Sequence, residues 1–276
     1  MSQQASVRTR DDDVVELPFV RDYAKFALRM NFRAIVALLK EARLVSDPSE
    51  RKSICLSGLQ LLHSSYEDFA ILLHAFRNRI TGKHLHLTIG VGDQSRTGST
   101  AMPQIFKHYQ SARQMLDNFG FDSLTHEKLS QCFNITEEEL EDHYRDIANS
   151  IKGLGEYQGT SNDYKNKLKH GKPVLEDALS KPNPDHVLFP RWTEHGGKPV
   201  LERNWVNASL KQLEVATILV AKTYITSLDF LGLFVLHYYP EYADEFLHKT
   251  IAKCRTECVD QVRALGLQSQ GLTEPV

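Results

Sequence analysis

A short polar segment, Ser-Asn-Asp-Tyr-Lys-Asn-Lys-Leu-Lys-His-Gly from Ser161 to Gly171, holds the residue types in this chain that are best suited to chemistry. At the helical period Asn162, Asn166 and His170 lie on one face, with Lys165 beside them. Histidine titrates near neutral pH and can exchange protons, lysine can neutralise charge on phosphate oxygens, and an asparagine amide can orient either group. The combination suits cleavage of a phosphodiester without a metal.

The sequence predicts a helix of about three turns for this segment. A side-chain oxygen at positions 161–162 can cap the first turn, while Gly171, followed by Pro173, ends the helix. Tyr164 and Leu168 share the opposite face and can dock on a core. The polar face is therefore expected to point away from that core.

The run Lys165-Asn166-Lys167-Leu168-Lys169-His170 resembles the active motif of the HEPN superfamily. In that family an arginine, a polar residue that is often asparagine, and a histidine line a cleft at a homodimer interface in a helical bundle. Many members are metal-independent RNases of toxin, phage-defence or RNA-surveillance systems. The resemblance implies a homodimeric endoribonuclease in which His170 is the general acid or base, Lys165 stabilises the phosphorane and Asn166 orients them. It also implies RNA as substrate and a regulatory or antitoxin protein as a partner.

Lys165 stands where the family has arginine, and this departure leaves two other interpretations open. Lysine keeps the positive charge but lacks the planar fork that holds a phosphate by two hydrogen bonds. A non-catalytic helical module that binds RNA or a partner protein fits the same residues. So does a solvated surface helix whose terminal His170 interacts with the helix dipole.

Contacts with RNA are expected to be local. The formal net charge is -2 and the pI is near 6.6, which argues against a general nucleic-acid binder. Lysines are concentrated around the motif, and the residues predicted to bind RNA are Lys167, Lys169, Lys172 and Asn162.

Arg77-Asn78, followed by His84, is a second match to a looser form of the same pattern. Gly82 lies between the arginine and the histidine and is expected to break the helix. A broken helix would remove the shared face, so this match ranks below the one at Lys165.

Residues 83–100 form the least regular part of the chain. Leu85, Leu87 and Ile89 alternate with polar residues, which predicts a short strand, and a glycine-containing loop follows from Gly90 to Gly98. The loop lacks the third glycine of a dinucleotide fingerprint and any Gly-Lys-Ser/Thr sequence. We therefore expect a mobile surface loop and no nucleotide site.

No metal site is expected. His84 and His86 have no further ligand spaced to join them, so exposed histidines are the preferred interpretation. Cys254 and Cys258 are one helical turn apart and are expected to be core thiols, although approach of His248 would allow them to bind a metal. No other cofactor is indicated.

The predicted fold is all-α, a bundle of about six to eight helices with a small inserted β-hairpin. Residues 1–13 and 268–276 are expected to be flexible tails, and 14–267 a single HEPN-like domain. A hairpin is predicted within 186–206 around a glycine turn, and its Trp192 and Trp205 are expected to pack it onto the bundle, with stacking on an RNA base as the alternative. Helices are predicted at 18–44, from 48 to near Arg79, at 103–118, twice within 123–158, at 215–239 and at 241–263.

The expected compartment is a reducing cytosol. The four cysteines, Cys55, Cys132, Cys254 and Cys258, show no CxxC pairing, and nothing like a signal peptide precedes the first helix. The apolar segment 215–239 is interrupted by Lys222 and Asp229, so we expect a buried core helix and no membrane span.

Overall fold

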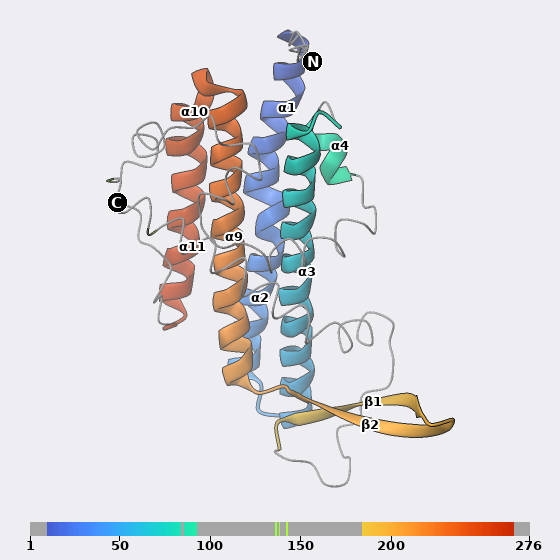
Figure 1. Ribbon diagram of the computed structural model, residues 1–276. Coiled ribbons are helices and arrows are strands. Elements are labelled where there is room, and N and C mark those ends of the chain that lie inside the picture. The colour runs from blue at the N-terminus through green and yellow to red at the C-terminus, as the bar shows by residue number, and fades with distance from the viewer. Residues whose placement is uncertain are drawn as a thin grey trace.

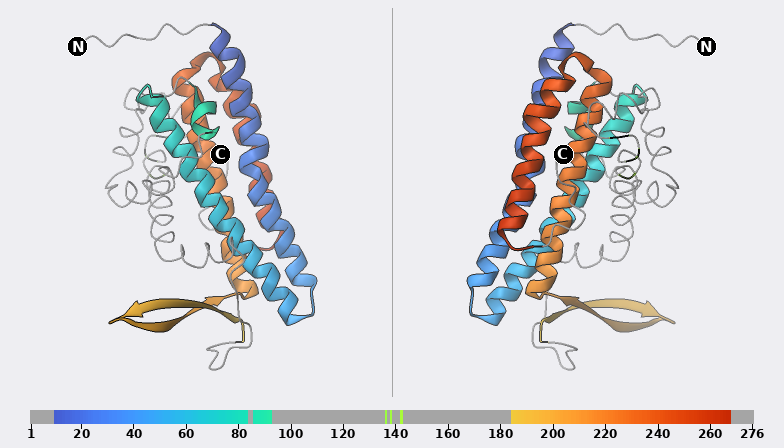
Figure 2. Two further views of the ribbon diagram at one scale, coloured as in Figure 1. Left: turned by 90° about the vertical axis from the view of Figure 1, so that its right-hand side faces the viewer. Right: turned by 90° about the vertical axis from the view of Figure 1, so that its left-hand side faces the viewer.

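The computed structural model describes residues 10–83, 86–92, 136, 138, 142 and 184–267. These residues are mostly helical, with one antiparallel pair of strands, which confirms the predicted helical character and the hairpin. Long helices run side by side along one axis, and the hairpin projects from one end of them (Figures 1 and 2). The predicted helix at 161–171 lies outside the described residues, as do those at 103–118 and, except for three isolated residues, within 123–158.

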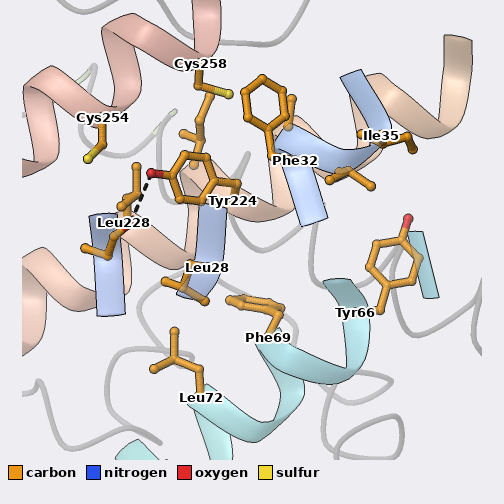
Figure 3. Packing of buried hydrophobic residues seen from close by; sticks show 14 of the residues in the cluster. Leu28, Phe32, Ile35, Tyr66, Phe69, Leu72, Tyr224, Leu228, Cys254 and Cys258 are labelled. Carbon is orange, nitrogen blue, oxygen red and sulfur yellow. Dashed lines mark hydrogen bonds between the residues drawn. The ribbon is translucent and has the colours of Figure 1, made fainter. Parts of the chain in front are cut away.

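The N-terminal helical rod consists of α1 (Arg10–Asp22), the π-helical turn η1 (Tyr23–Ala27) and α2 (Leu28–Leu44). It begins eight residues before Pro18, whereas the sequence predicts Pro18 in its first turn. In η1 the Leu28 N–H donates to the Tyr23 carbonyl, five residues back, instead of to Ala24. The Ala24 carbonyl accepts from the Tyr224 hydroxyl at 3.0 Å, and this bond ties the rod to the core (Figure 3).

Helix α3 (Pro48–Ile80) confirms the second predicted helix almost to the residue. Asp47 caps it, because its Oδ1 accepts from the Glu50 N–H at 2.7 Å. At the other end Gly82 has a φ of +71°, so the chain leaves the helix there as expected. Three residues join α2 to α3, and the two helices pack against each other as the predicted antiparallel hairpin.

Helix α9 (Leu210–Tyr238) is the central buried helix that the sequence predicts. Ser209 caps it by accepting from the Gln212 N–H. It is the one described helix long and apolar enough to cross a membrane, but 83% of its most apolar stretch is buried by the rest of the protein. That burial is consistent with the core helix of a soluble protein.

The core lies where α2, α3 and α9 contact one another. Aromatic rings fill much of it, with Phe69 and Phe76 of α3 against Phe230 of α9. Figure 3 shows Phe69, Leu72, Leu28 and Tyr224 converging in this layer. Gly58 permits the close approach of α3 to α9, since a Cβ there would lie 2.1 Å from the Leu213 Cδ1.

The last helical rod runs through α10 (Pro240–Phe246), η2 (Leu247–Ala252) and α11 (Lys253–Ala264). It covers α9, and its Arg255 donates to Asp229, the charged residue in the middle of α9. A buried carboxylate without a partner would cost several kcal/mol, about 3–5 when one member of such a pair is removed. The polar interruption of α9 is therefore compensated inside the bundle.

The strand predicted around Leu87 is wrong. Residues Leu87–Gly92 form the short helix α4, which packs on α3 near its C-terminal end (Figure 1). Leu87 is fully buried, and its N–H donates to the Glu16 side chain of α1. Burial of the Leu87 side chain and the hydrogen bond to Glu16 decide the local conformation. The alternation of apolar and polar residues at 85–89 reveals neither of them.

The hairpin consists of β1 (His186–His195) and β2 (Lys198–Asn207), joined by Gly196 and Gly197. Both glycines have positive φ, 59° and 77°, as a two-residue type I′ turn requires. Val187 and Phe189 at its base join the core, while the outer half stands clear of the bundle (Figure 2). The hairpin therefore packs on the described part of the bundle at its base, where Trp205 is half-buried.

Asp68 of α3 makes stability depend on pH. Burial raises the pKa of Asp68 to about 6; a 2.7 Å hydrogen bond from Asn31 Nδ2 lowers it, and the negative charge of Glu67 raises it further. Because the folded pKa exceeds the unfolded value, the contribution of Asp68 to stability is full below about pH 4 and is lost as the pH rises to about 6. Asp68→Asn does not titrate and lacks this loss. We therefore expect the difference in unfolding free energy, variant minus parent, to be about 2 kcal/mol larger at pH 7 than at pH 4. Urea denaturation at both pH values measures this, and an equal difference at the two would contradict it.

Candidate functional site

The residues predicted from the motif lie outside the described residues. This applies to the catalytic set and to the RNA-binding set, namely Lys165, Asn166, His170, Lys167, Lys169, Lys172 and Asn162. Their roles stay predictions.

The second Arg-Asn match is described in part. Arg77 and Asn78 lie in the last turn of α3, whereas His84 is outside the described residues. Thr81 caps this helix end, with its N–H and hydroxyl both donating to the Arg77 carbonyl at 3.0 and 2.8 Å. The helix therefore breaks where the sequence predicts.

After the break the chain turns back and brings a different histidine to the same end of α3. His86, just before α4, has its Nδ1 4.0 Å from the Oε2 of Glu16, and Arg79 has its Nε 3.7 Å from the Oε1 of the same side chain. We define Glu16, Arg79, His86, Tyr238 and Tyr239 as the Glu16 cluster. It lies at the end of the bundle opposite the hairpin (Figure 1).

Glu16 is fully buried, and every contact of its carboxylate compensates that burial. Oε1 accepts from the Leu87 N–H and Oε2 from the Tyr239 hydroxyl. The contact with Arg79 is an ion pair, since 3.7 Å is too long for a hydrogen bond. The carboxylate thus links α1, α3, α4 and the α9–α10 junction.

The ring of Tyr238 holds Arg79 in place. The Arg79 guanidinium carbon lies 4.5 Å from the centre of the Tyr238 ring, a cation–π contact. The rings of Tyr238 and His237 are nearly perpendicular to each other, with their centres 4.6 Å apart. Arg79 and His86 remain partly open to solvent, with 15% and 25% of their side chains exposed.

Asn78 adds an amide beside the cluster. It is 6% exposed, and its Nδ2 has no hydrogen-bond partner among the described residues. A buried amide donor left unpaired costs about 1–3 kcal/mol.

This end of the bundle holds residue types that other proteins use for acid–base catalysis and anion binding. A histidine near a carboxylate can exchange protons, and a fixed arginine can hold a phosphate oxygen. The predicted motif likewise combines a basic residue with asparagine and histidine. The basic residue is Arg79 at this end of the bundle and Lys165 in the motif.

Sequence reasoning missed Glu16, Arg79, Tyr238 and Tyr239 as members of a site. Glu16 and Tyr239 are 223 positions apart, and no spacing rule relates them. The available signals were a glutamate in the first turns of a helix and a Tyr-Tyr-Pro sequence at a helix end. Both patterns are common in helical proteins.

The histidine and cysteines considered for a metal do not come together. His248 pairs with Asp244 at 3.2 Å on the surface, whereas Cys254 and Cys258 are buried and free. Among the residues that the structure describes, no three His, Cys, Asp or Glu side chains are grouped as metal ligands. The interpretation of the two cysteines as core thiols is confirmed, and Figure 3 shows them beside Tyr224.

Buried thiols should be chemically inert in the folded protein. Burial raises the pKa of Cys258 to about 12, against the lowering effect of Arg29 and Arg255, and burial raises the pKa of Cys55 to about 11. In a Cys132→Ser variant, we expect a thiol reagent at pH 8 to modify these groups only as fast as the protein unfolds. Rapid labelling of the native variant, followed by mass spectrometry, would contradict this expectation.

Comparison with family models, with curated proteins and with solved structures gives no match to this chain.

Proposed function

We propose that this protein is a metal-independent endoribonuclease of toxin or phage-defence type that cleaves RNA by general acid–base catalysis. His170 exchanges a proton with the 2′-hydroxyl or the leaving oxygen, Lys165 stabilises the phosphorane and Asn166 orients the reacting groups. Lys167, Lys169, Lys172 and Asn162 hold the RNA backbone.

The observation that carries the proposal is the i, i+4 spacing of Asn162, Asn166 and His170 beside Lys165. The mostly helical architecture of the described residues is compatible with the resemblance to HEPN domains. With the predicted helices between 103 and 171, the whole bundle would have six to eight helices. The resemblance also supports a homodimer and a regulatory protein partner.

The Glu16 cluster supports the same chemistry independently. Arg79 and His86 meet at one carboxylate, and the Asn78 amide lies in the same turn of α3 as Arg79. Arginine, asparagine and histidine are the types that bind a phosphate and move a proton without a metal. The cluster is a second set of residues of these types, and the variant His86→Ala tests whether it takes part in cleavage.

A second candidate function is a non-catalytic module that binds RNA or a partner protein. Lys165 favours it, because lysine cannot make the bidentate phosphate contact of the arginine it replaces. This module would bind RNA or protein without producing fragments.

The experiment compares the purified parent, His170→Ala and His86→Ala on a labelled RNA, with and without a chelator. We expect the parent to cut the RNA, the products to end in a 2′,3′-cyclic phosphate, and the chelator to have no effect. Expression of the parent in bacteria should also stop growth and fragment cellular RNA.

The variants separate the two sets of residues. Loss of cleavage in His170→Ala alone assigns the chemistry to the motif, whereas loss in His86→Ala alone keeps the ribonuclease and moves the chemistry to the Glu16 cluster. A parent that is inactive on every RNA, yet binds RNA or a protein, would overturn the enzyme in favour of the binding module.

A further inference from the structure

The hairpin leaves two apolar side chains in solvent. Val200 and Leu201 of β2 are 40% and 39% exposed, and since they are neighbours in a strand they lie on opposite faces of the sheet. The outer half of the hairpin stands clear of the bundle (Figures 1 and 2). A two-stranded hairpin on its own is at best marginally stable in water.

The two prolines of the hairpin show which backbone groups face outward. Pro190 lies opposite Arg203, and Pro199 lies opposite Glu194. Proline has no N–H, so it fits an antiparallel ladder where the N–H would point away from the partner strand. By alternation, Leu201 and the other odd-numbered residues of β2 point their backbone polar groups outward.

The two edges therefore differ. The edge of β1 is interrupted near its middle by Pro190, which protects it against pairing with another strand. The edge of β2 carries its proline, Pro199, next to the turn, and beyond it offers outward N–H groups at Leu201, Arg203 and Trp205. Arg203 is exposed and Trp205 half-buried, and no further strand among the described residues pairs with this edge.

We propose that the β2 edge pairs antiparallel with the β2 edge of a second copy of this chain, forming a four-stranded sheet across a two-fold axis at Arg203. This pairing is an interaction surface distinct from the ribonuclease proposal and does not rest on it.

The sequence of β2 is self-complementary when two copies pair antiparallel about Arg203. A two-fold axis at Arg203 places Leu201 opposite Trp205 of the other copy on one face, and Val200 opposite Val206 on the other face. Each of these pairs would bury apolar surface of one chain against an apolar residue of the other. A helix or flat surface docked on the hairpin would cover only one of its faces, whereas an added strand covers an apolar residue on each.

The interface is small, and the two arginines meet at its centre. Directly opposed like charges weaken a strand pair. Strand pairing alone buries less than the roughly 1,200 Å² of a stable complex. The dimer is accordingly of the transient class, formed at tens of micromolar protein.

Two proline variants test the edge, measured by sedimentation velocity from 1 to 200 µM. Leu201→Pro removes an outward N–H of β2, whereas Glu194→Pro makes the same change on the edge of β1, and neither removes a hydrogen bond within the hairpin. We expect Leu201→Pro to weaken dimerisation at least about tenfold, because the two-fold axis repeats the change and two intermolecular hydrogen bonds are lost. Glu194→Pro should dimerise like the parent. A monomeric parent, or equal behaviour of the two variants, overturns the proposal.

A charge exchange tests the position of the axis and needs no proline. When the parent is mixed with the Arg203→Glu chain, a two-fold axis at residue 203 brings opposite charges together. The mixed dimer should form a few-fold more tightly than either homodimer, and fluorescence energy transfer between labelled chains measures it. No preference for the mixed dimer would overturn the proposed register.

Discussion

Replacement of His170 by alanine should abolish RNA cleavage and any toxicity while leaving helicity and melting temperature nearly unchanged. His170 is the one group of the motif that can move a proton near neutral pH, and loss of a general acid or base typically costs about 10²–10⁴-fold in rate. The sequence predicts it at the polar end of a short helix, where a substitution changes stability by about half a kcal/mol or less. Initial rates on a labelled RNA and thermal melting by circular dichroism give the two readouts.

His248→Ala is the matched control for this prediction. His248 is a surface histidine with 64% of its side chain exposed, paired one turn away with Asp244 on α10. Its removal should leave cleavage at the parent rate. Loss of activity in both variants would mean that the assay reports stability or expression instead of catalysis.

Lys165→Arg tests whether Lys165 contacts the phosphate, and here the expected change is an increase in activity. Arginine restores the planar fork that can hold a phosphate by two hydrogen bonds, so the variant should cleave at least as fast as the parent. An inactive Lys165→Arg protein would show that Lys165 is not at the phosphate, and parent-like cleavage by His170→Ala would remove the motif from the mechanism.

The long helices could be predicted because their determinants are local. Asp47 and Ser209 cap α3 and α9, apolar residues follow the helical period, and Gly82 ends α3. The two-glycine turn identified the hairpin in the same way. Each of these signals acts within a few residues of where it stands in the sequence.

The errors have a common physical cause, which is contact between distant parts of the chain. Leu87 starts a helix because Glu16 of α1 accepts its N–H and the core buries its side chain. Gly82 breaks the helix after Arg77, as the sequence predicts. The returning chain nevertheless places His86 and Arg79 on one carboxylate, which no pattern within α3 could reveal.

The second large effect is expected at Glu16, where alanine should lower the free energy of unfolding by about 3–5 kcal/mol. The substitution leaves the Leu87 N–H and the Tyr239 hydroxyl without their acceptor, and it leaves Arg79 partly buried without its counter-charge. Urea denaturation followed by circular dichroism measures the loss. Glu41→Ala, at an exposed position of the same helical rod, should change stability by no more than about 0.5 kcal/mol.

Graded substitutions separate the charge of Glu16 from its hydrogen bonds. Glu16→Gln keeps an acceptor and the shape of the side chain but loses the charge, so it should cost less than Glu16→Ala. Tyr239→Phe removes a single donor and should cost about 1–2 kcal/mol. An alanine variant no less stable than the phenylalanine variant would show that Glu16 does not hold the cluster together.

The decisive measurement is a double-mutant cycle between Glu16 and Arg79. If the carboxylate compensates the buried guanidinium, Arg79→Met should cost less in the Glu16→Ala background than in the parent, because the unpaired cation is removed with it. The stem of methionine keeps contact with the Tyr238 ring, so the comparison isolates the charge. We expect a coupling energy of about 1–3 kcal/mol between the two substitutions. If the costs of Glu16→Ala and Arg79→Met add in the double variant, Glu16 stabilises the fold only through its hydrogen bonds to Leu87 and Tyr239.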